Sequence, residues 1–340
     1  MTRPRNYILI SSVTFGLLLL ATFFFLAPYF FTGTASAAVI RIPRDATAQN
    51  LKDSLRKYFD ADYSSRAVRA FDLLGRTPAE RYGAYEIPEG TSPAAAARIL
   101  SRGAQTAIPL TINGVRKLDT FLPRIASKFN FTADDLSNLL NDSTLMASYG
   151  LTPQQAPALF LNDTYYLYWT ASAKDLIDKL ADNYNRFWTP ANRDKATALG
   201  LSPAEISIVA SITDEETNAE SEKGRVGRLY INRLHQGMKL QADPTVRYAL
   251  NDFTIKRITE KHLSAPGPYN TYRIHGLPPG PIRTVSTRTL QAILDSKPSD
   301  DLYMCAKEDF SGTHNFASTY DEHLRNARRY RRALDDRGIK

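Results

Sequence analysis

The feature that most constrains this chain is an uncharged stretch near its N-terminus. No charged residue occurs between Arg5 and Arg41, and the apolar core of the stretch runs from Tyr7 to Phe31. A run of this length can cross a bilayer as one helix. Arg3 and Arg5 precede it, and such basic residues tend to stay on the cytoplasmic side. We therefore predict a cytoplasmic tail at 1–6, a transmembrane anchor at 7–31 and an exported body.

A cleaved signal peptide is the alternative to a retained anchor. The Ala-Ser-Ala at 35–37 has the small-residue pattern of a cleavage site. The apolar stretch is longer than such signals usually are, so we favour the anchor. Both interpretations put the body outside the cytoplasm, which makes cytoplasmic nucleic acid a poor partner.

Composition limits the remaining function classes. The chain has 340 residues and 43% hydrophobic content, enough for one large or two ordinary domains. Its formal charge of +8 suits an anionic neighbour such as lipid headgroups or an acidic polymer. Cys305 is the single cysteine, so no internal disulfide can form. The sequence has no phosphate-binding glycine loop, nucleophile elbow or zinc spacing, and we expect neither metal nor cofactor.

The first part of the body is predicted to be a strand–helix–helix–strand module. Its expected elements are a strand at 38–43, helices at 45–59 and 64–74, and a strand at 80–88. Ser64 or Ser65 is the expected N-cap of the second helix. A further helix at 91–103 should end at Gly103.

The next part mixes one strand with several helices and an aromatic segment. We expect a strand at 106–112, a turn at Asn113-Gly114, and helices at 117–129, up to about Leu140, and at 173–188. The segment 156–170 is dense in aromatic residues. These aromatic side chains are expected to pack in the core or between domains. The alternative is that they form a surface on which sugar rings stack.

An acidic helix carries the main candidate for chemistry. Ser202 and Glu205 form a capping box around Pro203, and the helix should run through Thr217. Its stripe of buried positions passes Val209 and Ile212 and reaches Glu216 four residues later. The other nearby acids have ordinary explanations: Asp214 and Glu215 should be solvated, and Glu220 and Glu222 should lie at the start of the next helix.

Glu216 is therefore the acid to explain. A carboxylate on a buried face is costly to ionise, so its pKa should rise. A raised pKa is what a general acid needs near neutral pH. The alternative is a buried ion pair with Arg225, Arg228 or Arg233.

Two loops downstream favour a polar-ligand cleft. The segments 240–250 and 269–282 are rich in turn formers, and they present Gln241, Asp243, Asn270 and Tyr272. The alternative is that these residues only shape the turns.

The segments 210–250, 269–282 and 312–323 resemble the signature blocks of the YceG-like, or MltG, endolytic murein transglycosylases. The resemblance covers roughly residues 38–335 and implies an α+β fold with a LysM-like subdomain at 38–105 and a catalytic domain at 106–340. It implies an inner-membrane enzyme whose periplasmic body cuts nascent glycan strands of peptidoglycan and ends their elongation, with peptidoglycan synthases as candidate partners.

The resemblance also implies a catalytic residue. The family's glutamate is the last acid of an E-K-E-T motif, which is Glu216 in the D-E-E-T of this chain. The first acid of the motif is Asp214 here, and its side chain is shorter than that of the family's glutamate. Asn162 stands where the family often has proline.

The implied chemistry needs only one strong acid and base. Glu216 would protonate the glycosidic oxygen after N-acetylmuramic acid and then take the proton of that sugar's own 6-hydroxyl, giving a 1,6-anhydro end. Candidates for holding the sugar are Gln241, Asp243, Asn270, Tyr272 and His314. His314 also fits a loop histidine that bonds backbone carbonyls.

Two other functions remain open from the sequence. One is a non-catalytic cell-wall-binding scaffold. The other is a true hydrolase in which Asp243 or Glu222 activates water. The basic segment 323–340 predicts a solvated helix face, or a contact with anionic lipid or with carboxylates of the stem peptide.

Overall fold

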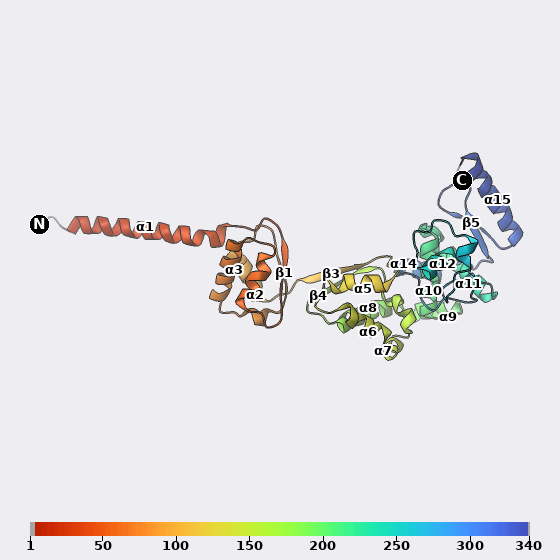
Figure 1. Cartoon of the computed structure of the whole chain (residues 1–340), viewed down its shortest axis with the longest axis horizontal. Coiled ribbons are helices and arrows are strands. Elements are labelled where there is room, and N and C mark those ends of the chain that lie inside the picture. Colours follow the sequence, from red (N-terminus) through yellow and green to blue (C-terminus); the bar gives the residue numbers. More distant parts are fainter. Residues whose placement is uncertain (1–3, 339–340) are drawn as a thin grey trace. The chain divides into compact units, whose positions relative to one another are not determined.

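A computed structural model describes the backbone of residues 4–338 and the side chains of residues 12–338. The chain is a mixed α+β protein with an N-terminal apolar helix, as predicted, and it divides into two compact units (Figure 1). The first unit comprises Met1–Ile108 with Lys128–Asn130 and Tyr166–Ala171, and the remainder forms the second. Arg3 and the first half of the tail predicted at 1–6 lie outside the described residues.

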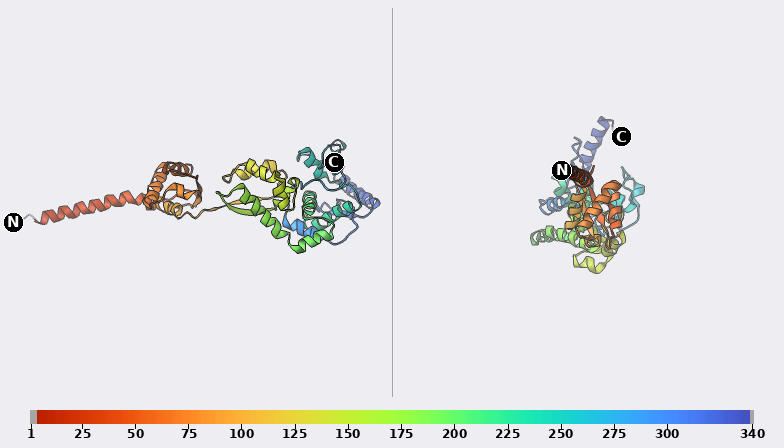
Figure 2. Two further views of the ribbon diagram at one scale, coloured as in Figure 1. Left: turned by 90° about the horizontal axis from the view of Figure 1, so that it is seen from below. Right: turned by 90° about the vertical axis from the view of Figure 1, so that its left-hand side faces the viewer.

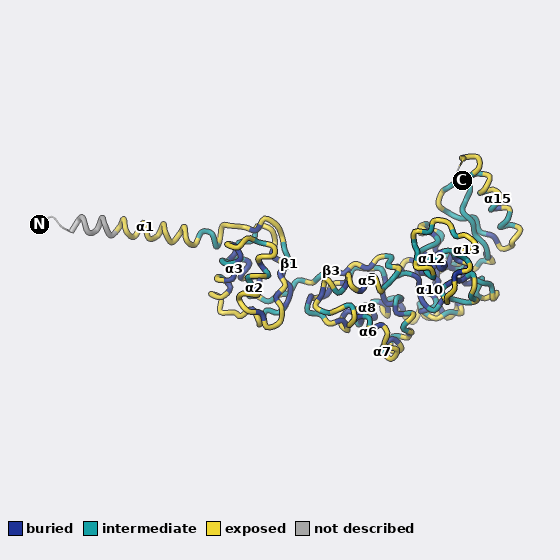
Figure 3. The backbone as a smooth tube through the Cα atoms, viewed as in Figure 1, coloured by how far each residue is buried: buried dark blue, intermediate teal, exposed yellow. Residues whose placement is uncertain are grey.

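The N-terminal helix, α1 (Pro4–Phe31), is one continuous element (Figures 1 and 2). Its segment Ser12–Phe31 has a mean hydropathy of 2.0, and no part of it is buried inside the protein. Figure 3 shows this segment as exposed almost to its C-terminal end. A predominantly apolar segment of 20 residues matches the hydrocarbon thickness of a bilayer, so α1 fits a single-pass membrane anchor.

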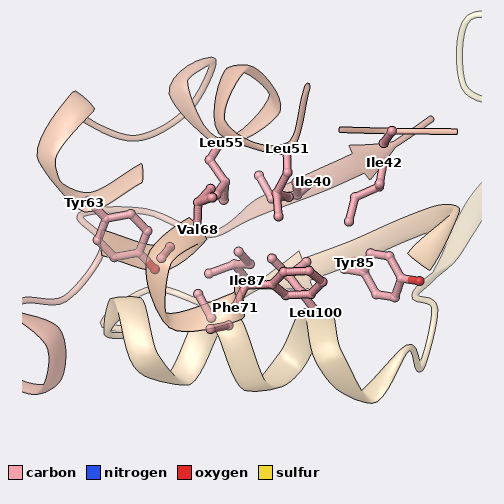
Figure 4. Packing of buried hydrophobic residues seen from close by; sticks show 14 residues of the cluster. Ile40, Ile42, Leu51, Leu55, Tyr63, Val68, Phe71, Tyr85, Ile87 and Leu100 are labelled. Atoms are coloured by element: carbon pink, nitrogen blue, oxygen red, sulfur yellow. The ribbon is translucent and has the colours of Figure 1, made fainter. Parts of the chain in front are cut away.

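The first unit packs helices on a two-stranded sheet. β1 (Ala38–Ile42) pairs antiparallel with β2 (Gly83–Ile87), and Ile40 lies opposite Tyr85. The helices of this unit are α2 (Ala48–Arg56), α3 (Ala61–Leu73), the 3₁₀ turn Pro78–Arg81 and α4 (Pro93–Arg102). Their buried side chains converge in one core (Figure 4). Gly103 ends α4 in the left-handed conformation, as expected.

The predicted cap of α3 was wrong. The helix begins at Ala61, and the carboxylate of Asp60 caps it by accepting hydrogen bonds from the backbone N–H groups of Asp62 and Tyr63. Ser64 and Ser65 lie inside the helix, where their hydroxyls donate to carbonyl oxygens four residues earlier. An aspartate ahead of the serines is the better cap because its charged carboxylate can accept from more than one orphan N–H, and here Oδ1 accepts both bonds.

The next part of the chain has a small sheet and a helical layer. β3 (Ala107–Ile112) pairs with β4 (Asp163–Tyr168). Its first helices are α5 (Leu118–Ala126), α6 (Ala133–Asn141), α7 (Ser143–Ser148), the 3₁₀ turn Pro153–Leu159, α8 (Ala173–Phe187) and α9 (Pro190–Ala198). The aromatic segment alternates: Tyr165, Leu167 and Trp169 are buried, whereas Tyr166 and Tyr168 are exposed. Core packing therefore explains its inward positions, as predicted.

The C-terminal half is built around α10 (Pro203–Glu216). That helix packs against α11 (Lys223–His235), α12 (Asp243–Leu250) and α14 (Thr287–Leu294). The 3₁₀ turn Glu220–Glu222 precedes α11, and α13 (Glu260–Leu263) follows α12. β5 (Tyr303–Ala306) pairs antiparallel with β6 (His314–Ala317), and α15 (Tyr320–Asp336) packs on both strands. Most basic side chains of α15 are exposed, consistent with a solvated face.

Candidate active site

The site begins with α10, whose start and end are locally encoded. Ser202 and Glu205 form the predicted capping box, and Pro203 is the first helical residue. The helix stops at Glu216 because Thr217 is extended, with φ −141° and ψ 138°. Between these ends every residue from Ile206 to Asp214 is buried, so α10 is a core helix rather than an amphipathic one.

Glu216 lies at the wall of a cavity of about 160 Å³. Its Oε1 accepts a hydrogen bond of 2.8 Å from the Tyr230 hydroxyl. The side chain is only partly exposed, which is consistent with its facing the cavity. The residues lining the cavity are Glu216, Leu229, Tyr230, Arg233, Gln241, Asp243 and Met304.

The environment of Glu216 favours its protonated form. Burial raises the pKa of the carboxyl from 4.5 to about 7, and the carboxylates of Asp243 and Glu215 act in the same direction. The Tyr230 hydrogen bond and the Arg247 charge oppose this rise in the pKa. A raised pKa was expected from the position of Glu216 on the helix, and the structure confirms it.

The alternative explanation of Glu216, an ion pair with arginine, was wrong. Arg225 pairs with Asp301 instead. Arg228 donates to the side chain and carbonyl of Ser296, and Arg233 donates to backbone carbonyls. Within the part of the chain that the structure describes, Glu216 has no cationic partner at ion-pair distance.

The predicted exposure of the two neighbouring acids was also wrong. Asp214 is 8% exposed, and its Oδ1 receives Lys223 Nζ at 2.8 Å and the Thr289 hydroxyl at 2.7 Å. The side chain of Glu215 is 8% exposed and pairs with Arg116 and Arg283. Helical periodicity assigned them to solvent because it assumed one buried face, whereas α10 is enclosed by several helices.

Asp214 and Lys223 line a wider polar cleft of about 830 Å³. Arg186, Asn218, Glu220 and Arg288 also line it. The last turn of α10 therefore presents one carboxylate to this cleft and another to the small cavity that holds Glu216.

The structure brings Asp243, Gln241 and Tyr272 together with Glu216. Asp243 is the first residue of α12, and its Oδ1 accepts a 2.6 Å hydrogen bond from the Tyr272 hydroxyl. Gln241 has a φ of +51°, a left-handed conformation that is uncommon for a residue with a side chain and that recurs at functional sites. Asp243 thus adds a second carboxylate to the cavity, which helical periodicity within α10 could not reveal.

Asn270 has a different environment from the other candidates. It is fully buried, and its Nδ2 donates to the carbonyls of Leu263 and Ala265 while its Oδ1 accepts from the Tyr272 N–H. These bonds fix the loop that presents Tyr272. Gly280 lies further along the same loop. A larger residue would clash there, because its Cβ would overlap the Gln154 carbonyl oxygen.

His314 is held by an acid. Its backbone N–H donates to Glu222 Oε1 at 2.8 Å, and its Nδ1 lies 3.0 Å from Glu222 Oε2. The alternative for His314, a loop histidine that bonds backbone carbonyls, does not describe these contacts: the residue begins β6, and the strand places it beside Glu222 at the start of α11. His314 does not line the cavity of Glu216.

Tyr230 is the residue of this site that the sequence analysis missed. It lies on the buried side of α11 and is 2% exposed. A signal was available, because a tyrosine on a buried helix face usually needs a hydrogen-bond partner for its hydroxyl. That requirement could have linked α11 to the acid at the end of α10.

Comparisons with known proteins identify the family of the chain. The model of the YceG-like family matches residues 40–329. An endolytic murein transglycosylase of Bacillus subtilis (strain 168) is 24% identical over 310 residues, covering 86% of this chain and 84% of that protein. A protein of the same name from Streptococcus pneumoniae serotype 2 (strain D39) is 24% identical over 212 residues, covering 61% of this chain and 36% of its own length.

A solved structure gives the same family name. A crystal structure of a YceG-like protein from Listeria monocytogenes matches with a TM-score of 0.53 and 24% identity, over 86% of this chain and 99% of that one. This likeness supports the fold alone. The family model extends over most of the chain, covering parts of both compact units and all of α10. The chain therefore belongs to the YceG-like family.

Proposed function

We propose that this protein is a lytic transglycosylase that cuts peptidoglycan glycan strands, with Glu216 as its catalytic acid and base. The single observation that supports this most strongly is the carboxyl of Glu216 in a cavity, with a pKa of about 7. Near neutral pH such a group exists in both forms, so it can donate a proton and later accept one. Relatives named endolytic murein transglycosylase supply the substrate class.

The proposed reaction balances without water. Glu216 donates its proton to the glycosidic oxygen that leaves C1 of N-acetylmuramic acid, and the C1–O bond breaks. The 6-hydroxyl oxygen of the same sugar then forms a bond to C1, and its proton returns to the Glu216 carboxylate. The attacking group is tethered to the reacting carbon, so no second carboxylate is needed to position a nucleophile.

The neighbours of Glu216 would divide into substrate contacts and positioning residues. We assign substrate contacts to Gln241, Asp243 and Tyr272, since the first two line the cavity and Tyr272 bonds to Asp243. Tyr230 is a positioning residue, because its hydroxyl holds Oε1 and leaves Oε2 to face the substrate. Asn270 would act through the Tyr272 loop that it holds.

We assign His314 to the rim of the site. It bonds to Glu222, which is the N-cap of α11, the helix that carries Tyr230. This assignment makes His314 a candidate for contacts with sugars away from the reacting bond.

A hydrolase is the second candidate, and one observation favours it. Asp243 shares the cavity with Glu216, and two carboxylates are what hydrolytic glycosidases use. The Tyr272 hydroxyl already occupies Asp243 Oδ1, so one oxygen remains to hold a water. The two reactions differ in their products, which makes them separable by experiment.

The domain plan extends the same proposal. We assign residues 38–105 to a LysM-like subdomain that binds glycan and residues 106–340 to the catalytic domain. We assign 1–6 to the cytoplasm and 7–31 to the inner membrane, which leaves the body in the periplasm. We further propose that the protein cuts inside nascent strands and so ends their elongation, with peptidoglycan synthases as candidate partners; the word endolytic in the relatives' name supports the internal cut.

The test is an analysis of products from purified peptidoglycan. The full chain in detergent should release fragments that end in 1,6-anhydro-N-acetylmuramic acid, and no label should enter the new terminus in ¹⁸O-labelled water. Reducing ends that carry ¹⁸O as the main product would instead establish the hydrolase. If the protein binds peptidoglycan but releases no fragments, the scaffold interpretation replaces both.

A further inference from the structure

The first unit carries an apolar groove next to the membrane helix. The groove has a volume of about 280 Å³, and its walls come from the last two turns of α1, the end of α3 and the first half of α4. α1 packs against both α3 and α4 at this place. The groove therefore belongs to one compact unit and is continuous with the helix that fits a membrane anchor.

Two leucines beside the groove are exposed although the unit has a complete core. Leu73 is 85% exposed and Leu74 is 47% exposed. The core of the unit is formed by other side chains, among them Leu51, Leu55 and Phe71 (Figure 4). Adjacent leucines at the end of a helix, both lining an apolar groove, indicate a surface that is covered by something apolar.

Three arginines surround these leucines. Arg98 lines the groove itself, Arg69 lies one helical turn before Leu73, and Arg76 follows Leu74 by two residues. All three are exposed, and none of them makes an ion pair with another described residue. Apolar side chains with a cationic rim are typical of surfaces that bind the interface of an anionic membrane.

The length of α1 gives the level at which this surface lies. Ser12–Phe31 has 20 residues, which as a helix spans about 30 Å, the thickness of the hydrocarbon core. The α1 residues that line the groove, Phe25 to Phe30, belong to the last two turns of that span. The groove must then open near the boundary between acyl chains and headgroups.

We propose that this groove binds phospholipid of the leaflet from which α1 leads into the body. Leu73 and Leu74 insert among the acyl chains, one acyl chain occupies the groove, and Arg69, Arg76 and Arg98 bind lipid phosphates. The first unit is thereby held against the membrane surface by a second contact besides α1. This inference rests on the membrane position of α1 and is independent of the proposed reaction.

Depth-dependent quenching tests the proposal on the full chain in vesicles of phosphatidylcholine and phosphatidylglycerol. In a Cys305→Ser background, Leu73→Cys carries an environment-sensitive fluorophore, and nitroxide-labelled lipids serve as quenchers. Phe23→Cys in α1 sets the scale for a buried position, and Gln49→Cys, exposed on α2 of the same unit, is the control. We expect quenching at Leu73 at least about threefold stronger than at Gln49.

Charge reversal tests the phosphate contacts. Arg69→Glu combined with Arg98→Glu should lower the ratio of docked to undocked protein about fivefold for each arginine, measured as lost quenching at Leu73. Quenching at Phe23 should not change. The matched control is Arg325→Glu with Arg332→Glu, which reverses two exposed charges on α15 and should leave the Leu73 signal intact.

Several results would overturn the proposal. One is equal quenching at Leu73 and Gln49, which would mean that the leucines face water. Another is an intermolecular disulfide at position 73 between two unlabelled copies of the Leu73→Cys chain, which would make a second copy of the protein the occupant. A third is an equal loss of quenching at Leu73 in the variant with both arginines reversed and in the α15 control variant. That result would show that the arginines make no specific contact with lipid phosphates.

Discussion

Asp214 and Glu216 lie two residues apart at the end of one helix, yet their surroundings differ in kind. Lys223 and Thr289 both donate to Asp214, at the wall of the wide polar cleft. Glu216 receives one tyrosine hydroxyl and faces a small cavity with no cation at ion-pair distance among the described residues. The comparison shows that the place of a carboxylate in a cluster of acids does not predict its role. The partner that tertiary packing brings to the carboxylate is the better guide.

The difference has a simple geometric origin. Residues two apart on a helix point in nearly opposite directions, and α10 is enclosed on several sides. Asp214 therefore meets the first residue of α11 and a residue of α14, whereas Glu216 meets the middle of α11 and the start of α12. An acid paired with an ammonium is suited to hold structure, and one without a cation at ion-pair distance and with a raised pKa is suited to exchange protons near neutral pH.

The largest expected effect is the loss of activity in Glu216→Gln. The amide keeps the shape and can still accept from Tyr230, but it cannot donate a proton to the leaving oxygen. We expect cleavage of peptidoglycan to fall by about 10²–10⁴-fold, with circular dichroism and the unfolding midpoint near those of the wild type at acidic pH.

The control for this variant is Glu260→Gln, which removes an exposed carboxylate outside both cavities. It should retain full activity. Wild-type cleavage by Glu216→Gln would show that the catalytic acid lies elsewhere, and Asp214 would then be the first residue to test.

The next effect is a dependence of stability on pH that belongs to Glu216. Its pKa is raised from 4.5 to about 7 in the fold, so the folded state holds a proton that the unfolded chain releases. The stability linked to this proton is complete below about pH 4.5 and is lost as the pH rises to about 7. The loss amounts to about 3 kcal/mol.

Urea unfolding of the wild type and of Glu216→Gln at about pH 5 and about pH 8 measures this difference. The variant cannot titrate at this position, so its stability relative to the wild type should rise with pH. A constant difference between the two proteins at both pH values would mean that Glu216 ionises as readily in the fold as in the unfolded chain.

Asp214→Asn should damage stability instead. Among the described residues, the substitution leaves the buried Lys223 with Glu220 as its one remaining ionised partner, and the expected cost is about 1–3 kcal/mol in the free energy of unfolding. Activity per folded molecule should remain much closer to the wild type than that of Glu216→Gln. Denaturant titration and activity normalised to folded protein measure the two quantities.

A matched exposed pair is available as the control for Asp214→Asn. Asp295 pairs with Lys195, and both side chains are more than two-fifths exposed. Asp295→Asn should therefore change the free energy of unfolding by less than about 1 kcal/mol. Equal losses of unfolding free energy in the two variants would mean that burial does not change how much the Asp214–Lys223 pair contributes to stability.

The parts of the fold that the sequence predicted well are those encoded by neighbouring residues. Ser202, Pro203 and Glu205 determine where α10 begins, and Gly103 marks the end of α4, because caps act within a few residues. The inward direction of Glu216 was also expected, since a position four residues beyond Ile212 repeats its direction on the helix, and there the partly exposed side chain meets the cavity.

The parts that escaped prediction depend on contacts between distant segments. Glu215 is buried by arginines 99 and 68 residues away, at Arg116 and Arg283. Asp214 needs Thr289 from α14, and Asp243 reaches the cavity of Glu216 only because α12 packs on α10. Periodicity describes one helix at a time, so it could not say which of several faces would be covered.

The smallest expected effect is a shift of the pH profile in Tyr230→Phe. The hydroxyl donates to Glu216 Oε1 and lowers the pKa of that carboxyl by stabilising its charged form. Removing it should raise the pKa, so activity that requires the protonated acid should persist to higher pH. We expect the alkaline midpoint of kcat/KM to move up by about half to one pH unit. Tyr149→Phe removes a comparable hydroxyl–carboxylate bond, to Asp178, away from the cavity, and should leave the midpoint unchanged. A Tyr230→Phe profile that only loses height at every pH would mean that the tyrosine supports the fold of the site without tuning its acid.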